Sequence, residues 1–306
     1  MPRAWCVYSH EYHVDMGEHV FPVEKYRLIH AALTAEGVLA PGDIVEPVPA
    51  SEDDLLLVHD AAHLAHMRRL AEKGWGYLTP DTPISPEILE KSILSAGGSI
   101  LAARIALELG GSLHLSGGFH HAFADHGEGF CYINDVAVAI RRMQADGLVS
   151  KASVIDCDLH QGNGTAAIFR GDAGVFTFSI HEEDNYPGVK PPSDLDIGLP
   201  YRCADAQYIE SLRHGVNAAV DGHSPELVIY LAGADPYEDD VLGSLAVTMQ
   251  GLRRRDQIVI DSCARAGVPL AIVLAGGYAR RAEDTVAIHC QTAREMKRRL
   301  GRDETQ

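Results

Sequence analysis

The stretch LVIYLAGAD, residues 227–235, is a short aliphatic run that ends in glycine, alanine and aspartate. A second run of the same kind, LAIVLAGGY, occupies residues 270–278. Short aliphatic runs without polar alternation are typical of strands that are buried on both faces of a parallel sheet. The two stretches therefore indicate an α/β fold in which helices cover both sides of a sheet.

Other apolar runs extend this pattern along the chain. Strands are expected at residues 4–8, 112–115, 153–156, 174–180, 226–232 and 268–275, and helices at 86–109, 134–145, 205–221, 244–265 and 281–300. Strands that alternate with helices imply βαβ units and a mainly parallel sheet. The segments 77–86 and 186–200 are rich in proline and glycine and are expected to be long loops, which are usually functional. No linker composition appears, so residues 1–306 are interpreted as one domain.

Composition limits the class of protein. The net charge of −17 argues against a nucleic-acid partner, and it suits either a cationic substrate or solubility alone. Six cysteines without a CxxC pair argue against a disulfide framework and for a reducing, cytoplasmic location. The N-terminus is too polar for a signal peptide, and no long apolar run predicts a membrane partner. Nothing in the sequence indicates the oligomeric state.

Polar side chains follow five of the expected strands. In parallel α/β sheets, ligands bind beyond the carboxyl ends of the strands. A single polar residue at such a place is usually a cap, but five groups at one edge indicate a functional site. The groups are His120 with His121, then Asp156 with Asp158 and His160, then His181, Asp235 and Tyr278.

The stretch VIDCDLHQGNG, residues 154–164, contains the most concentrated of these groups. Asp158 and His160 are two residues apart and point to the same side of an extended segment. With Asp235 as third ligand they form a set that is typical of a catalytic metal site with an open position. Iron(II), manganese or cobalt suit such oxygen-rich ligation as well as zinc. Asp156 faces the same side, so its carboxylate needs a nearby cation to offset the charge of Asp158. Alternatively, Asp156 only caps the turn, and the whole stretch is a capped turn without a metal.

Three further side chains suit hydrolysis. His120 and His121 follow two glycines and can supply the base and the acid for water attack, unless the pair is incidental. Tyr278 also follows two glycines and can donate its hydroxyl to an oxyanion, unless it packs in a loop. Phe130 and Tyr186 can face each other across an apolar channel or belong to the core.

Six segments, taken together, resemble the successive signature blocks of the histone deacetylase superfamily. HQGNG and the small size are most similar to the class IV branch and its bacterial relatives. The resemblance implies the arginase/deacetylase fold, a three-layer α/β/α arrangement around a mainly parallel sheet of about eight strands. The segments are GGFHHAFADHGEGFCYINDVAVAI, VIDCDLHQGNGTAAIF, SIHEEDNYPG, SDLDIGLP, AGADPYEDD and LAGGYA.

The resemblance also implies cations. It implies zinc at Asp158, His160 and Asp235. It implies a structural potassium ion whose ligands come from Asp156, Asp158, His160, Ser179 and Ile180.

The resemblance assigns roles around the zinc. His121 would be the general base for a zinc-activated water, and His120 its electrostatic partner or the acid for the leaving amine. Asp156 would orient His120, and Tyr278 would polarise the substrate carbonyl. Asn163 stands where class I members carry aspartate, and a neutral partner stabilises a charged His121 less. The implied substrate tunnel is lined by Gly129, Phe130, Tyr186 and Gly276.

These residues predict a zinc-dependent amidohydrolase that removes acetyl or longer acyl groups from N-acyl-lysine. An alternative substrate is a small acylated amine such as an acetylpolyamine. A ureohydrolase of the arginase kind is disfavoured because Gly162 and Tyr237 stand where ligands for a second metal are needed. A non-catalytic acyl-lysine reader is disfavoured because no ligand, base or tyrosine is missing.

Overall fold

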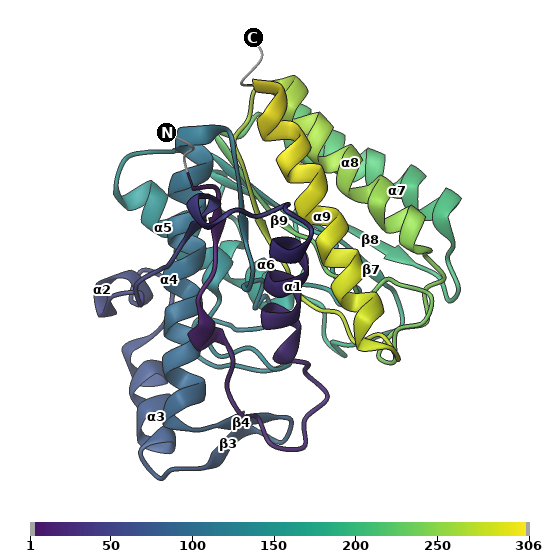
Figure 1. Ribbon diagram of the computed structural model, residues 1–306. Helices are drawn as coiled ribbons and strands as arrows, with labels where there is room; N and C mark the ends of the chain where they lie inside the picture. The colour runs from purple at the N-terminus through teal and green to yellow at the C-terminus, as the bar shows by residue number, and fades with distance from the viewer. Residues whose placement is uncertain (1–3, 304–306) are drawn as a thin grey trace.

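The computed structural model describes residues 4–303, and an eight-stranded sheet forms its centre (Figure 1). The strands are β1 (Cys6–Val7), β2 (Ile44–Val45), β5 (Gly111–His114), β6 (Ala152–Asp156), β7 (Val175–Glu182), β8 (Leu195–Leu199), β9 (Leu227–Leu231) and β10 (Leu270–Val273). Their order is β2-β1-β5-β10-β9-β6-β7-β8, and every neighbouring pair is parallel. The predicted α/β fold with a central parallel sheet of eight strands is confirmed.

Helices cover both faces of this sheet (Figure 1). They are α1 (Glu24–Ala35), α2 (Glu52–Leu55), α3 (Ala61–Ala71), α4 (Pro86–Leu109), α5 (Asp135–Ala145), α6 (Asn163–Phe169), α7 (Asp205–Asn217), α8 (Met249–Ala266) and α9 (Ala282–Asp303). Alternate residues of β9 point to opposite layers: Leu227 and Ile229 pack in one hydrophobic cluster with α4 and α5, whereas Val228 and Tyr230 belong to the other. The Tyr230 hydroxyl donates to Asp256 of α8 over 2.6 Å. The core therefore consists of two layers, one on each side of the sheet.

Helix α4 has the bounds that the sequence predicts. The Ser85 hydroxyl accepts a hydrogen bond from the Ile88 amide at its start, and Pro86 occupies the first turn. Gly110, at φ 81°, ends it in the left-handed conformation. By length and composition this helix could cross a membrane, but 61% of its most apolar window is buried inside the protein. A core helix gives the same signal.

Both segments that were expected to be long loops contain strands. The segment 77–86 overlaps a hairpin of β3 (Gly76–Thr79) and β4 (Thr82–Ile84), and the segment 186–200 ends in β8. The prediction was wrong here because β8 is an edge strand, whose aspartate and glycine interrupt the apolar pattern. Strand β2, with two residues, has no counterpart in the prediction, and neither do helices α1, α2, α3 and α6.

Helix ends differ from the prediction where caps decide them. Helix α8 begins at Met249, five residues after the predicted start, because Thr248 caps it by accepting the Gly251 amide at 3.0 Å. Ser244, the predicted start, instead donates its hydroxyl to Glu182. Helix α7 ends at Asn217, and one π-helical turn, Ala218–Gly222, replaces its predicted end.

Candidate active site

Four adjacent strands, β5, β10, β9 and β6, carry most of the predicted site residues beyond their carboxyl ends. The histidine pair follows β5, Tyr278 follows β10, Asp235 follows β9, and Asp158 with His160 follows β6. Because parallel strands end at one edge, these segments converge. His181 is an exception, since it lies within β7 and its ring bonds Ser179 at 2.9 Å. The predicted cluster is therefore present without His181.

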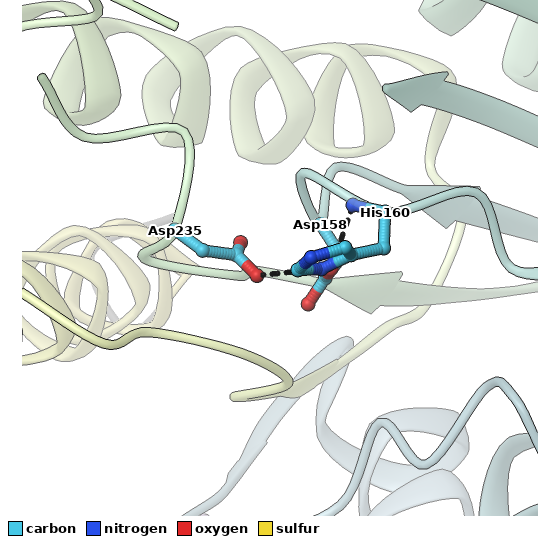
Figure 2. A group of neighbouring side chains, drawn as sticks. All are labelled: Asp158, His160 and Asp235. Atoms are coloured by element: carbon cyan, nitrogen blue, oxygen red, sulfur yellow. Dashed lines mark hydrogen bonds and ion pairs between the residues drawn. The ribbon is translucent and has the colours of Figure 1, made fainter. Parts of the chain in front are cut away.

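The three predicted metal ligands lie together and are buried. Their ligand atoms are all within 4.8 Å of one another. His160 Nδ1 is 3.0 Å from Asp158 Oδ1 and 3.4 Å from Asp235 Oδ2. Figure 2 shows the three side chains side by side. The structure thus joins Asp235 to the Asp-x-His segment, as the sequence predicts.

The electrostatics of this group suit a cation. Within residues 4–303, buried Asp235 Oδ2 has no hydrogen-bond partner. Burial and the charge of Asp158 raise the pKa of Asp235 to about 7. Burial disfavours a charged His160, but Asp158 and Asp235 outweigh it and raise its pKa to about 10. The group therefore lacks positive charge, which a divalent cation supplies better than a proton, and the residues fit a metal.

The two histidines that follow β5 have different partners and different pKa values. His120 Nδ1 is 2.7 Å from Asp156 Oδ2, and His121 Nδ1 is 2.7 Å from Asn163 Oδ1. Burial opposes a charge on His120, but Asp156 and Asp158 outweigh it and raise its pKa to about 9. Burial, together with the charges of His120 and His160, lowers the pKa of His121 well below its usual value. Near neutral pH the pair consists of one cation and one neutral imidazole, which suits an acid and a base.

Asp135 holds the turn that carries this pair, a role that sequence reasoning missed. Its carboxylate accepts the Phe119 amide at 2.8 Å and the Gly118 amide at 3.1 Å. The sequence indicates only a helix start here, and Asn134 alone provides the cap of α5 by accepting the Ala137 amide. The unused signal was an acid, Asp135, directly after the Asn134 cap.

Tyr278 is held by Asp240, another residue that the sequence prediction did not include. The Tyr278 amide donates to Asp240 Oδ2 over 2.7 Å. Burial and the charge of Asp158 raise the pKa of the Tyr278 hydroxyl well above its usual value. The hydroxyl therefore keeps its proton and can serve as a donor.

A cavity of about 210 Å³ opens over these groups. The predicted tunnel residues Gly129, Phe130, Tyr186 and Gly276 all line it. The sequence prediction missed several other lining residues, among them Phe21, Asp81 and Leu242. Beneath the cavity, Asp156 pairs with Ser179 across β6 and β7, and Ile180 is buried beside it. Potassium binding at these residues stays a prediction.

Comparisons with known proteins agree with this geometry. The histone deacetylase domain model matches residues 19–293. An uncharacterized protein of Picosynechococcus is 41% identical over 89% of this chain and 91% of that relative. Histone deacetylase 2 of Arabidopsis thaliana is 30% identical over 94% of this chain and 78% of that relative. A histone deacetylase-like amidohydrolase of Pseudomonas aeruginosa is 33% identical over 85% of this chain and 72% of that relative.

Solved structures share the fold. The crystal structure of the HDA15 HD domain superposes with a TM-score of 0.83 at 26% identity, covering 95% of this chain and 90% of that chain. The crystal structure of a histone deacetylase homologue from Aquifex aeolicus superposes with a TM-score of 0.81 at 20% identity, covering 97% of this chain and 84% of that chain. At this low identity, the similarity to the Aquifex aeolicus structure shows only a shared fold.

Proposed function

Because this chain belongs to the histone deacetylase family, we propose that it is a zinc-dependent deacylase acting on N-acyl-lysine side chains. The products are a carboxylate and a free amine. The observation that carries this proposal is the buried group of Asp158, His160 and Asp235, two members of which line one cavity with the histidine pair and Tyr278. Such a combination of metal ligands, acid, base and oxyanion donor is what amide hydrolysis requires.

Asp158, His160 and Asp235 are the residues that would hold the metal. When bound there, a divalent ion supplies Lewis acidity towards a water molecule and a carbonyl oxygen. The buried Asp235 Oδ2 atom, which makes no hydrogen bond within residues 4–303, supports this assignment. Two carboxylates and one imidazole suit zinc and also iron(II), so the identity of the ion is part of the test.

The side chains around this group divide the proton transfers. His121 is neutral and accepts the proton of the attacking water at Nε2, since Nδ1 faces Asn163. His120, held as a cation by Asp156, donates a proton to the leaving amine. The Tyr278 hydroxyl donates a hydrogen bond to the carbonyl oxygen as negative charge develops there.

The lining of the cavity favours a neutral, apolar chain as substrate. Phe130 and Tyr186 give it aromatic walls, and Gly129 keeps the wall between them thin. The side chain of an acyl-lysine is an alkyl chain that ends in an amide, so it suits such walls and presents the amide to the polar floor. A small acylated amine could enter in the same way, and it remains the alternative substrate.

A ureohydrolase reaction with two metals is not compatible with the site. A side chain at residue 162 would collide with Asp156 Oδ2, so the chain has no room for a further ligand there. Asp156 is itself engaged with His120. The proposal therefore uses one catalytic metal.

A substrate panel tests the proposal. Acetyl-lysine and longer acyl-lysine peptides, acetylpolyamines and guanidine substrates are assayed with the protein as purified, after chelation, and after addition of zinc or iron(II). We expect turnover of the peptides that chelation abolishes and added metal restores. Turnover of polyamines alone would assign the alternative substrate. Turnover that chelation does not change, or no turnover of any member, would contradict a metal-dependent deacylase.

A further inference from the structure

A tight turn places the carboxylate of Glu128 behind the histidine pair. The Cys131 amide donates to the Glu128 carbonyl at 2.9 Å, and both central residues, Gly129 at φ 53° and Phe130 at φ 67°, are left-handed. Such a conformation is uncommon for a bulky residue like Phe130, so packing around the turn must hold it. A Cβ atom at residue 129 would lie 2.6 Å from His121 Cδ2. The glycine thus allows the turn to lie directly against the base.

Glu128 continues a chain of hydrogen bonds that begins at His121. His121 Nδ1 is 2.7 Å from Asn163 Oδ1, and Asn163 Nδ2 donates to Glu128 Oε1 over 2.5 Å. An ionised carboxylate only accepts hydrogen bonds. The Asn163 atom that faces Glu128 must therefore be the amide nitrogen, and the atom that faces His121 must be the oxygen. This oxygen can only accept, so the proton of the neutral imidazole lies on Nδ1.

We propose that Glu128 is a positioning residue that fixes the tautomer of the base. With Glu128 present, the Asn163 amide has one favourable orientation, and His121 Nε2 has a free lone pair. Without this carboxylate the amide can turn over and present its NH₂ group to Nδ1. The ring proton would then move to Nε2, which could no longer accept a proton from water. The catalytic consequence rests on the proposed deacylase function, but the tautomer does not.

The same oxygen of Glu128 also holds the cavity wall. The Tyr186 hydroxyl donates to Glu128 Oε1 over 2.9 Å, and the Tyr186 ring stands edge-on to His121 with centroids 4.9 Å apart. One carboxylate therefore anchors both the base, through Asn163, and the aromatic wall. The other carboxylate oxygen of Glu128, Oε2, lies 3.9 Å from Nε2 of exposed His126. Substitutions at Glu128, Tyr186 and His126 can therefore separate the bond to Asn163 from the bond to Tyr186.

Steady-state kinetics with an acyl-lysine peptide test the positioning role. Glu128→Ala should lower kcat about 10–100-fold, the effect of losing a hydrogen bond to a charged group, with KM changed less. Glu128→Gln offers Asn163 either an acceptor oxygen or an NH₂ donor, so it fixes the Asn163 amide less strictly, and its kcat should lie between those of the wild type and Glu128→Ala. His126→Ala removes the outer contact, together with the ring contacts of His126 with Phe123 and Asp125, and should leave kcat unchanged. Tyr186→Phe should affect KM more than kcat.

The kinetic results that contradict the proposal are specific. If Glu128→Ala changes KM but not kcat, Glu128 only holds Tyr186 in the cavity wall and does not position His121. If Tyr186→Phe lowers kcat as much as Glu128→Ala does, Glu128 acts through Tyr186 and not through Asn163. If Glu128→Ala does not fold, Glu128→Met fills a similar volume without an acceptor and takes its place.

Imidazole ¹⁵N chemical shifts give a readout that needs no turnover. The signal of His121 is assigned by its loss in His121→Gln, and spectra are recorded with and without zinc. We expect the proton on Nδ1 in the wild type, a substantial fraction on Nε2 in Glu128→Ala, and a smaller fraction on Nε2 in Glu128→Gln, whose amide can both accept and donate. An unchanged Nδ1–H tautomer in Glu128→Ala would overturn the inference. If the wild type turns over no substrate, the deacylase proposal fails while this measurement still decides the role of Glu128.

Discussion

The backbone amide of Gly276 donates a hydrogen bond to Asp158 Oδ2 over 2.7 Å, although the two residues are 118 positions apart in the chain. Asp158 follows β6 and Gly276 follows β10, and β9 lies between these strands in the sheet. The bond therefore spans the group of metal ligands and fixes the turn that carries Tyr278. A shift of Gly276 would therefore displace both the metal ligand Asp158 and Tyr278.

Gly276→Ala should weaken metal binding. A Cβ atom at this position would collide with Asp235 Oδ2 and lie 2.6 Å from Asp158 Oδ2. Both ligands would have to shift, and we expect zinc affinity to fall about 10–100-fold, as for other changes that disturb ligand orientation. Competition with a fluorescent chelator measures the affinity. Gly301→Ala, where a Cβ atom meets nothing within 4 Å, is the control. Wild-type affinity in Gly276→Ala would show that the ligands tolerate the shift.

Asp235→Ala should leave the protein without tightly bound metal. This substitution removes a ligand whose Oδ2 makes no hydrogen bond within residues 4–303 and has His160 Nδ1 at 3.4 Å as an ion-pair contact. Metal content by elemental analysis should fall from about one ion per chain to a small fraction of that value. Asp239→Ala, which removes an exposed carboxylate four residues along the chain, should retain the metal. Equal zinc content in both variants would exclude Asp235 from the ligands.

Tyr278→Phe should separate chemistry from metal binding. The substitution removes one hydroxyl and leaves the amide that donates to Asp240 in place. Loss of an oxyanion donor lowers kcat about 10²–10³-fold in other hydrolases, and we expect a loss of this size. Metal content and melting temperature should match the wild type. Turnover close to the wild-type rate would contradict the donor role.

The parts of the fold that the sequence predicted well are those with strong local signals. Helix α4 has a serine cap, a proline in its first turn and a glycine at its end, so both of its bounds agree. Strands β9 and β10 are buried on both faces and therefore read as aliphatic runs. Strand β8 is an edge strand with half-exposed residues, and its pairing with β7 depends on contacts that its own sequence does not encode.

The candidate site shows the same division. Asp158, His160 and the histidine pair come from two short segments, and their side chains follow strands that were predicted. Glu128 meets Asn163, 35 residues away, and Asp240 meets Tyr278, 38 residues away. These bonds depend on how separate loops cross above the sheet. Periodicity and strand ends carry no information about such crossings, so Glu128 and Asp240 could be recognised only in the structure.

A buried lysine, Lys91, should make the free energy of unfolding depend on pH. Its Nζ atom lies 4.3 Å from the centroid of the Phe119 ring, in the layer beneath the histidine turn. Burial lowers the pKa of Lys91 to about 7; the charge of Asp135 opposes this shift and that of Lys25 adds to it. In the unfolded chain a lysine has a pKa of about 10.4. Between these two values the unfolded chain binds a proton that the folded chain does not, so the free energy of unfolding rises with pH.

The expected size of this effect follows from the two pKa values. From pH 7 to pH 9 the contribution of Lys91 to the free energy of unfolding should increase by about 2 kcal/mol. Lys91→Met removes the titrating group, so the melting temperature of the wild type relative to this variant should rise by several degrees over that range. Other titrating groups contribute equally to both proteins and cancel in the difference. Lys73→Met, which alters an exposed lysine, should show no such trend. A difference between wild type and Lys91→Met that stays constant from pH 7 to pH 9 would mean that Lys91 remains charged in the folded protein.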